Sequence, residues 1–99
     1  MVRHIVFWKM NGASPEKRRA QAVEIKRALE ALNGRIPGLL KLEVGIDFSA
    51  TEESADVALY SELESRAALE VYARHPEHVA VLPLVKAAHS ERRVVDYED

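Results

Sequence analysis

Two histidines flank a proline in the segment Tyr72-Ala-Arg-His75-Pro76-Glu-His78, and this segment has the residue types needed for acid–base chemistry. A histidine that is neutral near pH 7 can accept a proton, and a tyrosine can donate a hydrogen bond to a developing oxyanion. His78 is therefore the candidate general base, and Tyr72 is the candidate hydrogen-bond donor. The chemistry expected of this pair is removal of a proton next to the carbonyl group of a small apolar compound.

The helix expected after the proline gives His78 its reactivity. Pro76 predicts a helix start, so His78 falls in the first turn, where the helix dipole disfavours a charged imidazole. In the alternative interpretation, His78 packs beside a loop and Tyr72 is a core aromatic whose hydroxyl reaches the surface. His75 is expected to bond to the end of the preceding helix, and it is retained as a candidate ligand contact.

Three further residues are candidate walls of a ligand pocket between a sheet and its helices: His4, Trp8 and Leu29. His4 shares a strand face with Trp8, and this face lies either against the pocket or at a seam between two subunits. His89 lies near the end of the last predicted helix, where a solvated or capping role is expected.

The histidine spacing does not predict a metal site. His75 and His78 are three residues apart across a predicted helix break, and no third ligand lies at a characteristic distance. No phosphate-binding glycine loop or dinucleotide fingerprint occurs, so no cofactor is predicted.

Composition restricts the class of protein. The 99 residues predict one domain, spanning residues 1–99, and the net charge of −2 gives no reason to expect nucleic acid or an anionic membrane as a partner. The chain has no cysteine, no leader-like segment at its start and no apolar run of about 20 residues, the length needed to span a bilayer. These features predict a cytoplasmic protein without disulfides.

Hydrophobic periodicity and turn residues predict the order β-α-β-β-α-β, with the second helix broken in two. This order is the ferredoxin-like α+β arrangement with a four-stranded antiparallel sheet. Pro83 is expected to bend or interrupt the last helix. The expected strands are 2–9, 40–48, 55–63 and 92–97, and the expected helices are 15–33, 66–75 and 76–88.

The first expected strand has apolar residues on both faces. Val6 and Trp8 lie on one face, whereas Ile5 and Phe7 lie on the other. In so short a chain, one layer of helices covers only one face of the sheet. A second copy of the chain is expected to cover the other, which predicts a homodimer.

Four sequence elements resemble the stress-responsive A/B barrel (Dabb) domain family, in the right order and with fitting gaps. They are His4-Ile-Val, Ile36-Pro-Gly, Tyr72-x-x-His75-Pro-x-His78 and the closing Val95-Asp96-Tyr97. The resemblance implies a dimeric α+β barrel, in which two four-stranded sheets pack face to face with the helices outside.

One plant protein that is similar, a polyketide cyclase, closes a linear tetraketide by aldol condensation with a histidine base and a tyrosine. Its motif matches this sequence at Tyr72 and His78, and its strand-one histidine matches His4. This chain departs from the cyclase at two pocket positions, where Leu29 and Val57 replace a tyrosine and a histidine.

Three functions follow as hypotheses. The first is an enzyme or binder for a small apolar carbonyl compound. The second is a non-catalytic dimeric domain for stress response or assembly, which would have a filled core around His78. The third, implied by similarity to other dimeric barrels, is a cofactor-independent monooxygenase-like or haem-handling protein.

Overall fold

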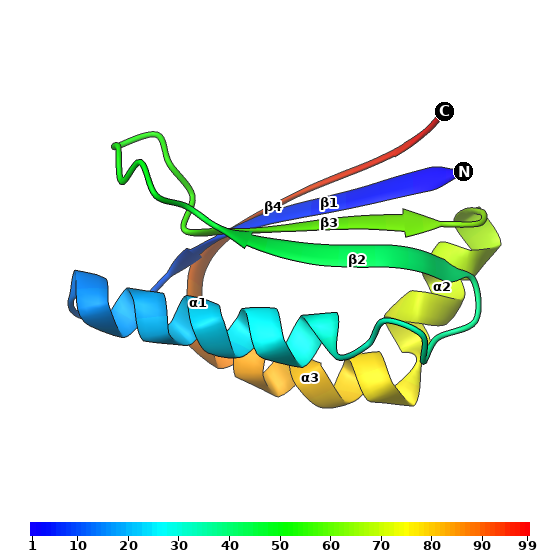
Figure 1. The fold of residues 1–99 in the computed structure, drawn as a ribbon, viewed down its shortest axis with the longest axis horizontal. Coiled ribbons are helices and arrows are strands. Elements are labelled where there is room, and N and C mark those ends of the chain that lie inside the picture. Colours follow the sequence, from blue (N-terminus) through cyan, green and yellow to red (C-terminus); the bar gives the residue numbers. More distant parts are fainter.

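The computed structural model describes all 99 residues and has the predicted ferredoxin-like α+β fold. Its sheet has the strand order β2-β3-β1-β4, with every neighbouring pair antiparallel. All three helices lie on one face of this sheet (Figure 1). No helix is long and apolar enough to cross a membrane. The elements are β1 (Val2–Met10), α1 (Pro15–Glu30), β2 (Leu39–Ile46), β3 (Val57–Leu63), α2 (Arg66–Arg74), α3 (Pro76–Ala88) and β4 (His89–Glu98).

Helix α1 begins where its capping residues predict. The Ser14 side chain accepts a hydrogen bond from the Lys17 backbone N–H at 3.1 Å, and proline occupies the first turn. The helix ends at Glu30, three residues earlier than Asn33, because the chain there passes into a series of turns. The buried face of α1 packs on the sheet through Ala22, Ile25 and Leu29.

Helices α2 and α3 are separated at His75, whose backbone is extended as expected for a residue before proline. A bend or an interruption was expected at Pro83, and the interruption does not occur, because α3 continues through Pro83 to Ala88. Proline has no N–H, so Pro83 cannot donate the usual helical hydrogen bond to the Val79 carbonyl. Both residues are exposed, and water can therefore bond to this carbonyl instead.

The strands differ from the sequence prediction at one register shift and at three boundaries. The β2–β3 register shifts between Leu39 and Lys41, so Leu40 points away from the core and is 54% exposed. Phe48 lies beyond the end of β2 and is 97% exposed. Strand β3 begins at Val57 rather than residue 55, and β4 begins at His89, directly after α3.

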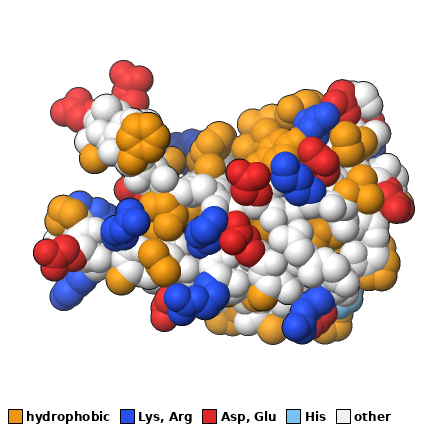
Figure 2. Space-filling view, viewed as in Figure 1, with side chains coloured by type: hydrophobic (Ala, Val, Ile, Leu, Met, Phe, Trp, Pro, Cys, Tyr) orange, Lys and Arg blue, Asp and Glu red, His pale blue; other side chains and the backbone are white.

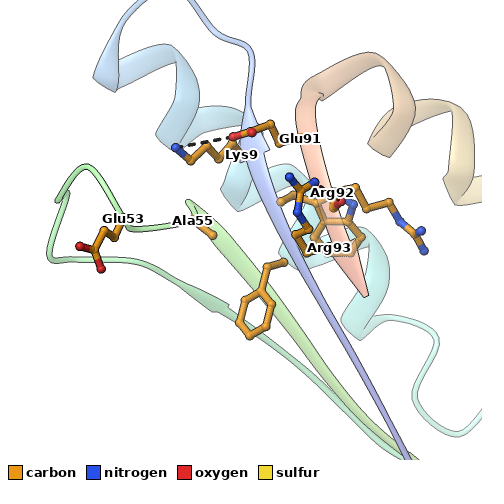
Figure 3. A pocket seen from close by; sticks show the side chains of 8 residues that line it. Lys9, Glu53, Ala55, Glu91, Arg92 and Arg93 are labelled. Carbon is orange, nitrogen blue, oxygen red and sulfur yellow. Dashed lines mark hydrogen bonds and ion pairs between the residues drawn. The ribbon is translucent and has the colours of Figure 1, made fainter. Parts of the chain in front are cut away.

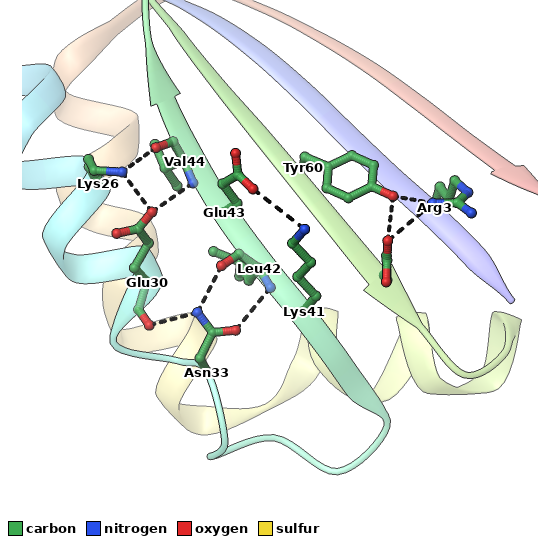
Figure 4. A network of polar contacts seen from close by, with 10 residues as sticks. Arg3, Lys26, Glu30, Asn33, Lys41, Leu42, Glu43, Val44 and Tyr60 are labelled. Carbon is green, nitrogen blue, oxygen red and sulfur yellow. Dashed lines mark hydrogen bonds and ion pairs between the residues drawn. The ribbon is translucent and has the colours of Figure 1, made fainter.

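Side chains of α1 and the turn after it cover the free edge of β2 (Figure 4). Asn33 accepts a hydrogen bond from the Leu42 N–H at 2.9 Å and donates one to the Leu42 carbonyl at 2.8 Å. Glu30 accepts from the Val44 N–H at 3.0 Å, and Lys26 donates to the Val44 carbonyl at 2.6 Å. These four bonds replace the strand partner that an edge strand lacks.

The sheet face that the helices leave open is partly apolar. Ile5 of β1 pairs with Tyr60 of β3 and with Val95 of β4, which places the three side chains in one row. Phe7 and Tyr97 lie on the same face and are 42% and 45% exposed. Hydrophobic side chains gather on the upper side of the molecule, over the sheet and away from the helices (Figure 2).

An ion-pair network borders this apolar row (Figure 4). Arg3 contacts Tyr60 and pairs with Glu62 at 3.1 Å and with Asp99 at 2.7 Å. The Tyr60 hydroxyl donates to Glu62 at 2.6 Å, and this bond raises the pKa of Tyr60. The network fixes the orientation of the tyrosine on the open face.

Candidate active site

A cavity of about 520 Å³ lies between the sheet and the helices. Nine of its 14 lining residues are hydrophobic, which suits an apolar ligand. The structure brings five of the six predicted site residues to this cavity: His4, Trp8, Leu29, Tyr72 and His78.

Tyr72 lies between two histidines. Its ring centroid is 4.3 Å from that of His78 and 6.0 Å from that of His4, the latter in an edge-on arrangement. The residue is only 2% exposed, and burial raises the pKa of its phenol to about 12, against a smaller opposing effect of the Arg92 charge. Tyr72 therefore keeps its proton over the whole physiological range and can act as a hydrogen-bond donor in the cavity.

His78 has a defined tautomer in its neutral state. Its Nδ1 lies 3.1 Å from the Ala73 carbonyl oxygen, which can only accept, so Nδ1 carries the proton. The lone pair is then on Nε2. Burial lowers the pKa of His78, and the positive charge of Arg92 lowers it further, whereas the hydrogen bond to Ala73 raises it by a smaller amount. The ring is thus held as a neutral base.

His4 is oriented from the neighbouring strand. It pairs with Asp96 in the β1–β4 register, and its Nδ1 bonds to an Asp96 carboxylate oxygen. A carboxylate accepts this bond, so Nδ1 is the donor and the other ring nitrogen of His4 is left for the cavity. The sequence could only suggest a bond between Asp96 and a histidine, because the strand register that joins these two residues is not visible in it.

His75 does not line the cavity. Its Nδ1 accepts a hydrogen bond from the Glu77 N–H at 3.1 Å and caps the start of α3, whereas a bond to the end of the preceding helix was expected. Its role as a ligand contact has no support in this geometry.

Three basic residues that the sequence did not indicate also line the cavity: Lys86, His89 and Arg92. His89 is a helix cap as expected, because its Nδ1 donates to the Val85 carbonyl at 2.9 Å, but its ring also borders the cavity. Arg92 pairs with Trp8 in the β1–β4 register and so shares its sheet face. The sequence signal that could have indicated Arg92 is the alternation of side chains along β4, which puts Arg92 on the same face as Asp96.

The family model for the stress-responsive A/B barrel domain matches residues 2–99 of this sequence. The chain belongs to the Dabb family. None of the curated proteins compared with this Dabb chain matches it by sequence.

Solved structures of similar proteins share the fold of this Dabb chain. A protein of Bacteroides fragilis, described as dimeric, ferredoxin-like and of unknown function, is 36% identical (TM-score 0.88), over 99% of this chain and 95% of its own. A dimeric ferredoxin-like protein of Thermobifida fusca is 25% identical (TM-score 0.83), and the match covers 99% of this chain and 90% of the other. A Dabb family protein of Mesorhizobium loti is also 25% identical (TM-score 0.74), and the match covers 99% of this chain and 95% of the other.

A second cavity, of about 530 Å³, lies between the loop that joins β2 to β3 and the neighbouring parts of β1 and β4 (Figure 3). Its lining mixes acids with bases: Glu53 and Glu91 lie near Lys9 and Arg93, and Lys9 pairs with Glu91 at 3.6 Å. It contains no histidine or tyrosine. The candidate acid–base residues of the Dabb chain therefore border the first cavity and not the second.

Proposed function

We propose that this Dabb protein binds a small apolar carbonyl compound in the first cavity and removes a proton from the carbon next to the carbonyl group. The observation that carries the proposal is the pairing of Tyr72 with His78 at 4.3 Å on the wall of an apolar cavity. The Ala73 carbonyl holds the His78 proton on Nδ1 and so leaves a bare Nε2 for the base.

The proposed step uses both side chains once. The C–H bond breaks, its proton moves to Nε2 of His78, and its electron pair forms the enolate. The Tyr72 hydroxyl donates a hydrogen bond to the enolate oxygen and so stabilises its charge. The proton then returns to the substrate carbon. Alternatively, the enolate carbon attacks a second carbonyl group of the same molecule, the C=O π bond breaks, and the resulting alkoxide takes the proton from His78.

The electrostatics favour this division of roles. Burial lowers the pKa of His78 and raises that of Tyr72 to about 12, so the base is unprotonated and the donor is protonated at the same pH. Two titratable groups whose environments separate their pKa values in this way are typical of an acid–base site. A non-catalytic domain with a filled core around His78 is less consistent with a cavity at this position.

Deuterium uptake tests the proposal directly. The protein in D2O is mixed with 1-phenylbutane-1,3-dione, and exchange at C2 is followed by proton NMR at mildly acidic pH, where the uncatalysed rate is slow. The wild type is expected to accelerate exchange, and His78→Asn to lower the catalysed rate by about 100-fold or more.

The matched control is His75→Ser, which removes an imidazole three residues away but keeps a side-chain acceptor for the α3 cap. This variant should retain the wild-type exchange rate. Catalysed exchange that survives in a folded His78→Asn protein would reject His78 as the base.

We also infer that the protein is a homodimer joined through the open sheet face. The row formed by Ile5, Tyr60 and Val95 leaves apolar side chains without cover, and the helices pack only on the opposite face. The related proteins of Bacteroides fragilis and Thermobifida fusca are described as dimeric.

A further inference from the structure

The charge of the first cavity is one-sided. No aspartate or glutamate lines it. All five of its non-hydrophobic lining residues are basic: His4, His78, Lys86, His89 and Arg92. The chain as a whole has more acids than bases, 16 against 14 excluding histidine, so this bias is local. The second cavity, of nearly equal volume, has two glutamates in its lining and is also bordered by Trp8 and Arg92.

The two permanent cations of the first cavity are not neutralised within the protein. Neither Lys86 nor Arg92 takes part in any of the eight ion pairs of the protein. Asp96, the nearest acid on the same face of β4, is bonded to His4 instead. The field in the cavity therefore favours an anion.

A buried donor without a partner lies beside Arg92. Trp8 is 5% exposed, and its indole Nε1–H is the one buried side-chain polar atom in the protein that has no hydrogen-bond partner. Trp8 lines the cavity and is the cross-strand partner of Arg92. A buried donor left unbonded costs stability, which a ligand oxygen can restore.

These groups lie away from the proton-transfer pair. Along β1, Trp8 is four residues from His4, which corresponds to about 13 Å at the rise of a β-strand. The cavity thus has a proton-transfer end, with Tyr72 and His78, and a cationic end near the junction of α3 and β4.

We propose that the ligand is an apolar oxo acid, a carbonyl compound that also carries a carboxylate, and that this carboxylate is bound by Arg92 and Lys86 and accepts a hydrogen bond from the Trp8 indole. The planar guanidinium suits a carboxylate, and the hydrophobic walls between the two ends suit an alkyl or aryl body. This inference rests on the proposed function, because it names the substrate class of the same cavity. Arg92, Lys86 and Trp8 position the ligand and take no part in the proton transfer.

A pair of isosteric probes tests the assignment. Binding of 4-phenylbutanoate and of the neutral 4-phenylbutanamide is measured by calorimetry on the full chain. The acid is expected to bind about tenfold or more tightly than the amide, since a hydrogen bond to a charged group contributes more than one to a neutral group. In Arg92→Gln this preference should fall to near unity, whereas the affinity for the amide should change little.

Arg19→Gln is the charge-matched control, because Arg19 is exposed on α1, makes no ion pair and lines neither cavity. It should keep the full preference for the acid. Trp8→Phe, which removes the indole donor and keeps an aromatic ring, should lower the preference several-fold. If this core variant does not fold, the Arg92→Gln comparison decides alone.

Equal binding of acid and amide by the wild type would overturn the inference, as would the same loss of preference in Arg19→Gln. Tighter binding of 3-phenylpropyl phosphate than of the carboxylate would overturn the choice of carboxylate. These outcomes are separate from the exchange experiment. If deuterium exchange depends on His78 but the acid and the amide bind equally, only the carboxylate proposal is rejected. If the acid is preferred through Arg92 but no exchange is catalysed, only the proposed catalysis is rejected.

Discussion

The rings of Tyr72 and His78 lie 4.3 Å apart, centroid to centroid, at an interplanar angle of 39°. The two residues come from different helices, α2 and α3, and the extended backbone of His75 sets the angle between these helices. The proline after His75 enforces that extended backbone. A local rule of backbone geometry thus places an acid–base pair at the wall of a cavity.

Tyr72→Phe is expected to separate stability from function. The hydrogen bonds around the cavity are made by His4, His78 and His89 and none by the Tyr72 hydroxyl, so its removal breaks no hydrogen bond within the protein. The free energy of unfolding, measured in urea, should stay within about 0.5 kcal/mol of the wild type. Catalysed exchange on the diketone should fall by at least tenfold. A large loss of stability would show that the hydroxyl has a structural role.

The pKa of His78, measured by an NMR titration of its imidazole, should lie below the ordinary value of about 6.5. Its first cause is burial, and the Arg92 charge adds to it. Arg92→Gln should therefore raise the pKa part of the way towards the ordinary value, whereas Arg19→Gln should leave it unchanged. A value above the ordinary one in the wild type would contradict a buried neutral base.

The same lowered pKa makes a prediction for stability. The unfolded chain binds a proton at His78 more readily than the folded chain does, so stability is lost as the pH falls through the unfolded pKa of about 6.5. The difference in unfolding free energy between pH 7.5 and pH 5 should be smaller in His78→Asn than in the wild type. An identical pH dependence in the two proteins would exclude this contribution.

Val95→Glu is expected to convert the proposed dimer into a monomer, because it places a charge in the apolar row of the open sheet face. Light scattering coupled to gel filtration measures the change in mass. Val79→Glu is the matched control: Val79 is 46% exposed on α3, against 52% for Val95 on β4. It should remain dimeric. A wild type that is monomeric at micromolar concentration would reject the dimer.

Asn33→Ala is expected to destabilise the fold by about 1–3 kcal/mol, since it leaves the N–H and the carbonyl of Leu42 without their partners. Asn33→Asp keeps the acceptor for the Leu42 N–H and loses only the donor. Its cost in urea unfolding should therefore be smaller. Equal costs for the two variants would indicate that the bond to the N–H contributes little.

Local patterns were sufficient to predict the fold, because helix starts such as Ser14-Pro15 and the alternation along β1 depend only on neighbouring residues. They failed at Leu40, where a bulge reversed the face of one residue, and at Phe48, which lies beyond the strand end. The first error came from an irregularity of strand pairing within β2, and the second came from extending the period-two pattern past the end of the strand.

The site was predictable where its residues form a motif, as in the segment from Tyr72 to His78. It was not predictable where residues meet across strands. The pairing of Arg92 with Trp8 and of Asp96 with His4 depends on the β1–β4 register, which tertiary packing sets. Long-range pairing is also what makes the cavity basic at one end.

The hydrogen bonds from α1 to the edge of β2 have a consequence for aggregation. Growth of a cross-β fibre requires each molecule to accept a new strand at both sheet edges, and the backbone of Leu42 and Val44 is already occupied by Asn33, Glu30 and Lys26. Only the β4 edge remains open to strand addition. Edge-to-edge association of this protein therefore ends at two copies, so the fold can expose a partly apolar sheet face without becoming a template for fibres.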